Sequence, residues 1–256
     1  MKVLRSIFLI LNYKTFIVAL LSVASTYLCG RYGLKADFPL TLIGIAIVFP
    51  VVFSIDSAYK RRELALAQLG DFKNHLLAIY HASRDWLEPS QPKFQDEVKT
   101  ELVETFEDMR TLFTSASTEV ALNEKKLTDK VSELSKFLQV FREHGLQAGE
   151  MSRVSQYISK IGGAIENMKV ILKYRTPVTL RSYSKLFIYS FSILYGPYFV
   201  FISENYSKGL EYMMPIIFSF ILVSLHNIQN HLENPFDQIG EDDIKFDVEN
   251  FTKMMD

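Results

Sequence analysis

Four uncharged, mostly apolar runs stand out along the chain. They lie at residues 15–30, 38–55, 186–203 and 212–232. A helix that crosses a bilayer needs about 20 mostly apolar residues, and each run nears that length with its apolar flanks included. The pattern therefore predicts four membrane-spanning helices. A secretory signal peptide is a less favoured explanation of the opening MKVLR and its apolar sequel, because the run continues too far and lacks a small-residue cleavage site.

The long segment between the second and third runs has a different pattern. Its apolar residues recur every three or four positions, the spacing of one helix face, and strand-like alternation is absent. Four stripes follow this spacing: Leu66, Leu69, Phe72, Leu76, Leu77 and Tyr80; Val98, Leu102, Phe106, Met109 and Phe113; Leu127, Val131, Leu134, Leu138 and Phe141; Val154, Ile158, Ile161, Ile165, Met168 and Leu172. We expect these stripes to pack amphipathic helices together.

The two patterns together predict an all-α membrane protein with four transmembrane helices and a cytoplasmic helical body between spans two and three. The expected segments are 1–55 for an N-terminal arm and the first two spans, 56–180 for the body, 181–232 for the last two spans, and 233–256 for an acidic cytoplasmic tail. Composition agrees with this mixture, since 48% of the residues are hydrophobic, 22% are charged and the mean hydropathy is +0.09.

Basic residues near the ends of the runs indicate the orientation, because cytoplasmic flanks are enriched in Lys and Arg. They gather before the first run, after the second and before the third, at Lys2, Arg5 and Lys14, at Lys60, Arg61 and Arg62, and at Lys173, Arg175, Arg181 and Lys185. The connections at 31–37 and 204–211 carry fewer. We expect a multi-pass protein of the cell (inner) membrane with both termini in the cytoplasm.

Several classes of function lack support in the sequence. The net charge of −1 offers no basic surface for nucleic acid. The single cysteine, Cys29, excludes an intramolecular disulfide and a multi-cysteine metal site. The five histidines form no H-E-x-x-H pattern, and the chain has no P-loop, G-x-S-x-G or glycine-rich dinucleotide turn. We therefore expect no enzyme and no catalytic residues.

The second run contains a regular row of large apolar residues. Ile45, Phe49 and Phe53 lie four apart and so stack along one helix face. Nearby Gly44 and Ala46 are small enough to let another helix approach closely. From spacing alone, contact with lipid or a neighbouring helix is the favoured explanation. A row turned toward a symmetry axis would instead form a hydrophobic constriction, which gates ions by dewetting.

Three segments, in order, resemble the bestrophin family of ion channels, including its bacterial and chloroplast-type branch. LTLIGIAIVFPVVFSIDSAY is similar to the family's second span, and YRTPVTLRSYSKLFIYSF to the start of its third. NPF followed by GEDD resembles the signature after its fourth span. The resemblance covers the order of spans along the whole chain, whereas the matched segments make up a minority of the residues.

This resemblance implies a homopentamer with one axial pore lined by the second spans. Alignment through Tyr59 places Ile45, Phe49 and Phe53 on the family's three-ring hydrophobic neck. The edges of phenyl rings are the positive part of their quadrupole, so edges facing the axis could contact a partly dehydrated anion. Chloride or another small anion is the expected ion, and cation conduction is the alternative because family members differ. Membrane lipid and other copies of the chain are the expected partners.

The second run also departs from the family pattern. Tyr59 is followed by Lys60-Arg61-Arg62-Glu63, where the family usually has an aromatic pair. Pro50 lies inside the apolar row and removes one backbone donor, which predicts a local kink.

The acidic end of the chain raises the question of a metal ion. NPFDQIGEDD supplies the carboxylate, carbonyl and amide oxygens that calcium prefers. Animal bestrophins carry a calcium-binding clasp at this signature. The resemblance makes Asn234 and Asp242 candidate ligands, with Asp243 beside them; calcium is the only cofactor considered, and no chemical cofactor is expected.

The match to the clasp is incomplete. Asp237-Gln238-Ile239 are extra, Ile244-Lys245 replace further acids, and His231 stands where the calcium-regulated members have Gln. The favoured explanation is structural: Pro235 ends the preceding helix, and Asp237 or the acids at 241–243 cap a following one.

Two functions from other classes fit the same pattern. A membrane receptor or scaffold could signal through the helical body, although no recognisable output motif is present. A secondary transporter usually carries ionisable groups or broken helices at mid-membrane. Gly196-Pro197 is the only hint of a broken helix, and a packing kink is the favoured explanation of it.

Overall fold

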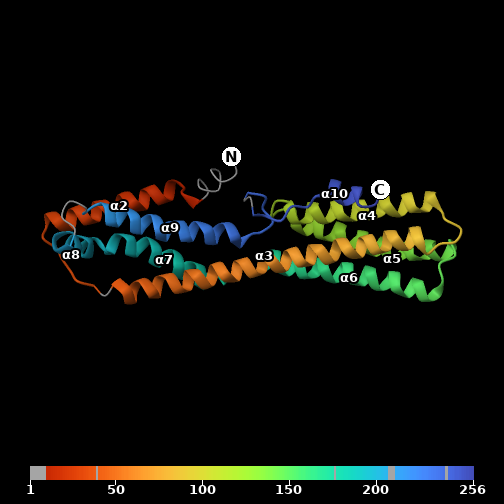
Figure 1. Ribbon diagram of the computed structural model, residues 1–256, viewed down its shortest axis with the longest axis horizontal. Helices are drawn as coiled ribbons and strands as arrows, with labels where there is room; N and C mark the ends of the chain where they lie inside the picture. The colour runs from red at the N-terminus through yellow and green to blue at the C-terminus, as the bar shows by residue number, and fades with distance from the viewer. Residues whose placement is uncertain (1–9, 39, 176, 207–210, 240–241) are drawn as a thin grey trace. The chain divides into compact units, whose positions relative to one another are not determined.

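The computed structural model describes residues 10–256 apart from 39, 176, 207–210 and 240–241, and it leaves the side chains of residues 40, 42, 43 and 206 undescribed. Regular structure in these described ranges is helical throughout, with no strand, which confirms the predicted class (Figure 1). The chain divides into two compact units. The first comprises residues 1–60, 175–234 and 239–242, and the second comprises 61–174, 235–238 and 243–256.

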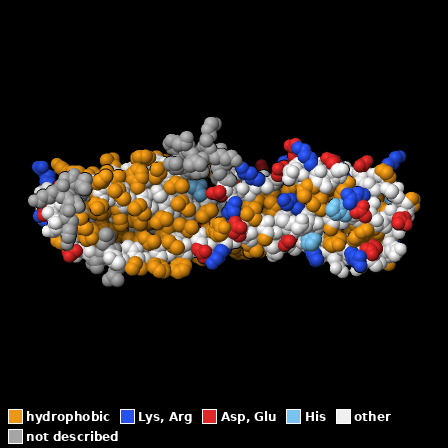
Figure 2. All heavy atoms as spheres, viewed as in Figure 1, with side chains coloured by type: hydrophobic (Ala, Val, Ile, Leu, Met, Phe, Trp, Pro, Cys, Tyr) orange, Lys and Arg blue, Asp and Glu red, His pale blue; other side chains and the backbone are white. Residues whose placement is uncertain are grey.

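The first unit is a bundle of long apolar helices. It contains α2 (Tyr13–Arg31), the N-terminal part of α3 (Leu40–Asp85), α7 (Val178–Leu194), α8 (Gly196–Tyr206) and α9 (Met213–Glu233). In Figure 1, α2 and α9 lie side by side, as their contacts also show. The buried core draws on α2, α3, α7 and α9: Val18, Ile47, Val51, Ile188, Leu222 and Val223. Figure 2 shows that hydrophobic side chains also cover most of its visible outer face.

Two of the described helices, α2 and α9, are long and apolar enough to cross a membrane. The helix that ends at Leu194 and the one that begins at Gly196 are bent by 46° and add a third span if they count as one. The predicted second span lies on the N-terminal part of α3, where several side chains fall outside the described residues. The arrangement of four spans therefore stays a prediction.

The second unit is an amphipathic helical bundle. It contains the rest of α3, with α4 (Pro92–Thr114), α5 (Val120–Glu143), α6 (Ala148–Lys173) and α10 (Val248–Lys253). Every apolar position of the four predicted stripes is buried or packs against this core, which confirms the expected packing. The helices break where the sequence carries EPSQPKF, between α3 and α4, and HGLQAGE, between α5 and α6.

The acidic C-terminal segment is held by its apolar residues. Phe236, Phe246 and Phe251 are buried in the core of the second unit. Two of them lie against Phe113 of α4, with ring centroids 4.9 Å from it for Phe236 and 5.9 Å for Phe246. Phe251 meets Phe106 edge to face at 5.0 Å. The charges that dominate this segment in the sequence obscured the packing role of its phenylalanines.

The helix that follows this segment, α10, has a different cap from the expected one. Its N-cap is Asp247, whose carboxylate accepts a hydrogen bond from the backbone N–H of Asn250 at 2.9 Å. The expected capping residues, Asp237 or the acids at 241–243, were wrong, because the helix begins after the acidic cluster. The expected end of α9 at Pro235 is confirmed, since that helix ends at Glu233.

Gly196 marks a packing break between α7 and α8, as expected. A Cβ atom placed on Gly196 would lie 2.5 Å from the Ser25 hydroxyl, 3.0 Å from the Ser25 carbonyl carbon and 3.2 Å from the Cys29 sulfur. The Ser25 hydroxyl donates a 2.7 Å hydrogen bond to the carbonyl of Ile193, in the last turn of α7. The missing side chain thus lets α2 approach closely enough to bond the end of α7.

We predict that Gly196→Ala destabilises the first unit. Its new methyl group must displace Ser25, which overpacks the contact at a cost of about 1–3 kcal/mol. Gly163→Ala in α6 is a matched control, because nothing lies within 4 Å of its new methyl and alanine is the better helix former. Thermal unfolding in detergent should show a lower midpoint for Gly196→Ala alone; equal midpoints would contradict the close contact.

Candidate functional site: the outward face of α3

The predicted neck residues share one exposed face of α3. Ile45, Phe49 and Phe53 are 48%, 56% and 59% exposed in the chain. The rings of Phe49 and Phe53 lie next to each other, with centroids 5.6 Å apart and planes tilted by 53°. The structure therefore brings the three side chains together as one outward row of large apolar groups.

The opposite face of the same helix turns is packed. Ile47, Val51, Ser54 and Ala58 are each at most 1% exposed. Because helix positions three or four apart share a face, these residues and the outward row point in opposite directions. The packing of the inner face against the rest of the first unit sets the rotation of α3 about its own axis, and this rotation turns the Phe49–Phe53 row outward.

Pro50 creates a gap in the backbone hydrogen bonding of α3, which continues helically through it. In a regular helix the N–H of residue 50 would donate to the carbonyl of Ala46, but proline has no N–H. The hydroxyl of Tyr183, on α7, donates to this carbonyl at 3.4 Å. A neighbouring helix thus supplies the donor that the proline removes, one turn from Phe49. Whether α3 kinks there stays a prediction.

A second polar contact ties the inner face of α3 to α9. The side-chain amide of Gln229 donates a 2.7 Å hydrogen bond to the hydroxyl of Ser54, and both residues are buried. In an apolar bundle such a bond fixes two helices in register, because breaking it leaves buried polar groups without their partner.

Neither Tyr183 nor Gln229 was among the residues singled out by the sequence. Tyr183 is one of many aromatic residues in the sequence, and Gln229 lies in the polar end of the last apolar run. The only available signal was Pro50, whose missing donor calls for a partner somewhere in the fold.

The candidate calcium ligands do not form a recognisable metal cluster among the residues that the structure describes. Asn234 is half-buried as the C-cap of α9, Asp242 is exposed and Asp243 is buried. The described ranges, which omit Gly240 and Glu241, hold no group of three or more His, Cys, Asp or Glu side chains suited to a metal ion. Calcium binding stays the less favoured explanation of this segment and is untested.

The loop beside these residues is closed by protein groups. The backbone N–H of Ile244 donates to the carbonyl of Pro235 at 2.8 Å. The side-chain amide of Gln238 donates to the carbonyls of Phe236 and Ile244, at 3.2 and 2.8 Å. Gln238 belongs to the three residues that are extra relative to the calcium-binding signature. The insertion therefore brings its own hydrogen-bond donor to carbonyl oxygens of this loop.

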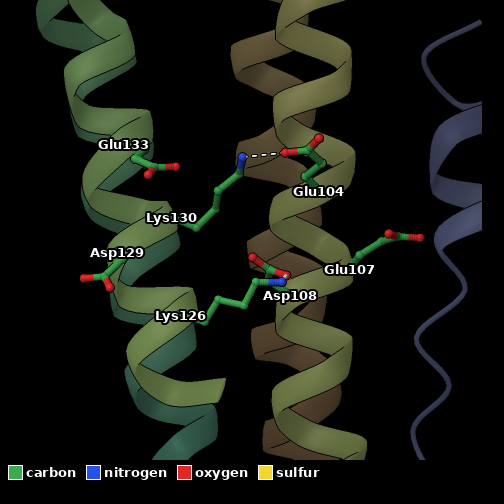
Figure 3. Close-up of a pocket in the computed structure, with 7 residues that line it drawn as sticks. All are labelled: Glu104, Glu107, Asp108, Lys126, Asp129, Lys130 and Glu133. Atoms are coloured by element: carbon green, nitrogen blue, oxygen red, sulfur yellow. Dashed lines mark hydrogen bonds and ion pairs between the residues drawn. The ribbon is translucent and has the colours of Figure 1, made fainter. Parts of the chain in front are cut away.

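A charged groove lies between α4 and α5 in the second unit. Five carboxylates and two lysines line it: Glu104, Glu107, Asp108, Asp129, Glu133, Lys126 and Lys130 (Figure 3). Lys130 lies 2.6 Å from Glu104 and 2.9 Å from Glu101, and Lys126 lies 2.6 Å from Asp108. Burial alone would lower the pKa of Lys130, but its hydrogen bonds to these glutamates outweigh burial and raise it. These contacts explain the groove as a row of ion pairs between two helices.

Histidines of the second unit pack on aromatic rings. His75 stacks on Tyr157 at 5.9 Å, and His144 stacks on Phe94 at 4.3 Å. Burial, and then the nearby charge of Lys160, lower the pKa of His75. These contacts explain both histidines as packing groups.

We predict that the Tyr183 hydroxyl matters only while residue 50 is proline. Tyr183→Phe keeps the ring contact with Phe187 but removes the donor, and should lower the free energy of unfolding by about 0.5–1.5 kcal/mol. Pro50→Ala restores the backbone N–H, so Tyr183→Phe should cost almost nothing in that background. A double-mutant cycle of unfolding midpoints measures this coupling. The same cost in both backgrounds would refute the compensation.

We predict that calcium leaves the stability of the purified protein unchanged up to millimolar concentrations, because Gln238 already donates to two loop carbonyls. Thermal unfolding with increasing calcium checks this, and magnesium at equal concentration controls for ionic strength. A saturable rise with calcium alone, abolished by Asp242→Asn, would instead establish the site.

The comparisons with known proteins find matches to the fold of this chain and none to its sequence. No family model and no curated protein matches the sequence. A variant of a bacterial bestrophin homologue from Klebsiella pneumoniae superposes with a TM-score of 0.79 at 13% identity, over 94% of this chain and 97% of that chain. A second variant of that homologue gives 0.76 at 13% identity, over 94% and 97%.

A further crystal structure, described as a membrane protein, gives a TM-score of 0.77 at 13% identity, over 95% of this chain and 98% of that chain. At such low identity the likeness concerns the fold alone, and it extends over nearly the whole of both chains. The resemblance found in the three sequence segments is thereby confirmed for the architecture: this chain has a bestrophin-like fold.

Proposed function

We propose that the protein is an ion channel, assembled as a homopentamer around a pore lined by the outward face of α3. Ile45, Phe49 and Phe53 form its hydrophobic neck, and chloride or another small anion is the conducted ion. Conduction by cations is the alternative within the same architecture. No chemical cofactor takes part, since the work is selection and gating of ions.

One observation carries the proposal. Within a bestrophin-like fold, α3 buries small and branched residues on one face and exposes a continuous row of large apolar groups on the other. Exposed single apolar residues are common, but a row that includes two phenylalanines with adjoining rings is a surface that favours being covered. Other copies of α3 around an axis would cover it with the same residues.

The chemistry of the row suits a gate for ions. A narrow apolar constriction sheds its water, and an ion that enters must give up part of its hydration shell. Phenyl rings that turn their edges toward the axis present the positive part of their quadrupole to such an ion. This supports an anion over a cation, without a fixed positive charge in the neck.

The exterior of the first unit supports a place in the bilayer. Large apolar side chains are exposed on α2 and α9, among them Leu20 at 70% and Ile221 at 55%. In water such a surface would drive association, whereas lipid chains can cover it at no cost. We propose a multi-pass protein of the cell (inner) membrane, with both termini in the cytoplasm as the basic flanks indicate.

A membrane receptor or scaffold is the alternative from a different class. The helical body of the second unit would then transmit a signal or hold a partner. A measurement of ion flux distinguishes the two functions, because a receptor or scaffold would not conduct ions.

We predict that replacing Ile45, Phe49 and Phe53 together with alanine raises the single-channel conductance and loosens gating. Smaller side chains widen the neck and admit water, which lowers the barrier to a partly dehydrated ion. Planar-bilayer recordings of the purified protein measure conductance and open probability, and the mass of the detergent-solubilised protein measures the oligomer.

The matched control replaces Ile17, Leu20 and Leu21 of α2 with alanine, because they too are exposed and apolar. This control should conduct like the wild type. A well-folded neck variant with unchanged currents would overturn the neck assignment, and a monomer without flux would overturn the channel itself.

A further inference from the structure

The outward row of α3 continues beyond Phe53 into charged residues. Asp56 follows Phe49 by seven positions, just under two turns, so it projects within about 20° of that ring. Lys60 follows Phe53 by the same seven positions and lies on the same side of the helix. The side chains of Asp56 and Lys60 are 48% and 72% exposed. The outward row of α3 therefore begins with large apolar side chains and ends in a carboxylate and an ammonium group.

These two charges form an ion pair along the helix. The Nζ atom of Lys60 lies 2.7 Å from a carboxylate oxygen of Asp56. The spacing is i, i+4 with the acid nearer the N-terminus, the favourable order for such a pair. Asp56 is the nearer of the two to Phe53, at about 5 Å along the axis for three residues.

We propose that the Asp56–Lys60 pair sets the balance between anions and cations at one end of the neck. This inference rests on the proposed function, since it takes the outward face of α3 as the pore lining. Repeated in every subunit, the pair places a ring of carboxylates next to the phenyl rings and a ring of ammonium groups one turn further along. Rings of charged side chains select ions of the opposite sign.

The pairing explains how a carboxylate ring can stand beside an anion-conducting neck. Each Asp56 charge has a compensating Lys60 charge within hydrogen-bonding distance, so the paired rings carry almost no net charge. Selection then falls to the phenyl edges of Phe49 and Phe53. Removing either partner leaves one ring unbalanced, and its field acts on every ion that passes the neck.

The test is the ratio of chloride to potassium permeability, taken from reversal potentials across a potassium chloride gradient. Asp56→Asn leaves the ammonium ring unbalanced and should raise this ratio by about threefold or more at 0.1 M salt, where the screening length is about 10 Å. Lys60→Gln should lower it by a similar factor. The double variant should return to the wild-type ratio, and all shifts should shrink at 1 M salt, where the length is about 3 Å.

Glu249→Gln and Lys253→Gln in α10 are matched controls. They break a pair of the same spacing and the same 2.7 Å distance in the second unit, and should leave the ratio unchanged. Unchanged or same-direction shifts in conducting Asp56→Asn and Lys60→Gln channels would overturn this inference and leave the channel intact. Absence of current from the wild type would overturn the proposed function and this inference together.

Discussion

The packing of one face of α3 is the constraint on which the candidate site depends. A helix in an apolar bundle is free to rotate unless one of its faces fits its neighbours better than the others. Ile47, Val51 and Ala58 are small or branched, and they leave almost no surface exposed. The larger residues on the other side, above all Phe49 and Phe53, are left to face outward. In the proposed channel, the face that lines the pore is thus set by residues on the opposite, buried face of the helix.

Polar groups within the apolar unit refine this arrangement. Hydrocarbon offers no substitute for a missing hydrogen bond, so each backbone group there must find a partner in the protein. The Ala46 carbonyl, orphaned by Pro50, finds the hydroxyl of Tyr183. The Ile193 carbonyl, at the break after α7, finds the hydroxyl of Ser25. Each case pairs a break in one helix with a hydroxyl on another, which ties the helices together at the points where they are irregular.

The second unit differs from the first because its helices carry charged residues on their outer surfaces. Some of its ion pairs join two helices: Lys169 and Lys173 of α6 both contact Glu124 of α5. Burial alone would lower the pKa of Lys169, but its hydrogen bonds to Glu124 and Glu166 raise it, so the ammonium form is favoured. Ion pairs at the exposed surface contribute little stability each, and the buried apolar stripes hold the fold together. Charge here specifies which helix faces meet.

The sequence by itself determined the helical class, the apolar runs and the stripes of the second unit, because apolar spacing reports directly which side of a helix avoids water. It also placed Ile45, Phe49 and Phe53 on one face, since that follows from their spacing. It could not decide whether this face turns outward or into the bundle. Both sides of the run are apolar, so the spacing of apolar residues does not show which side is buried. Only the tertiary structure decided this, through the volumes that fit against α2, α7 and α9. The hydrogen-bond partners of the Ala46 carbonyl and of Ser54 depended on it as well. Tyr183 and Gln229 lie far away in sequence and meet α3 only after the bundle has packed.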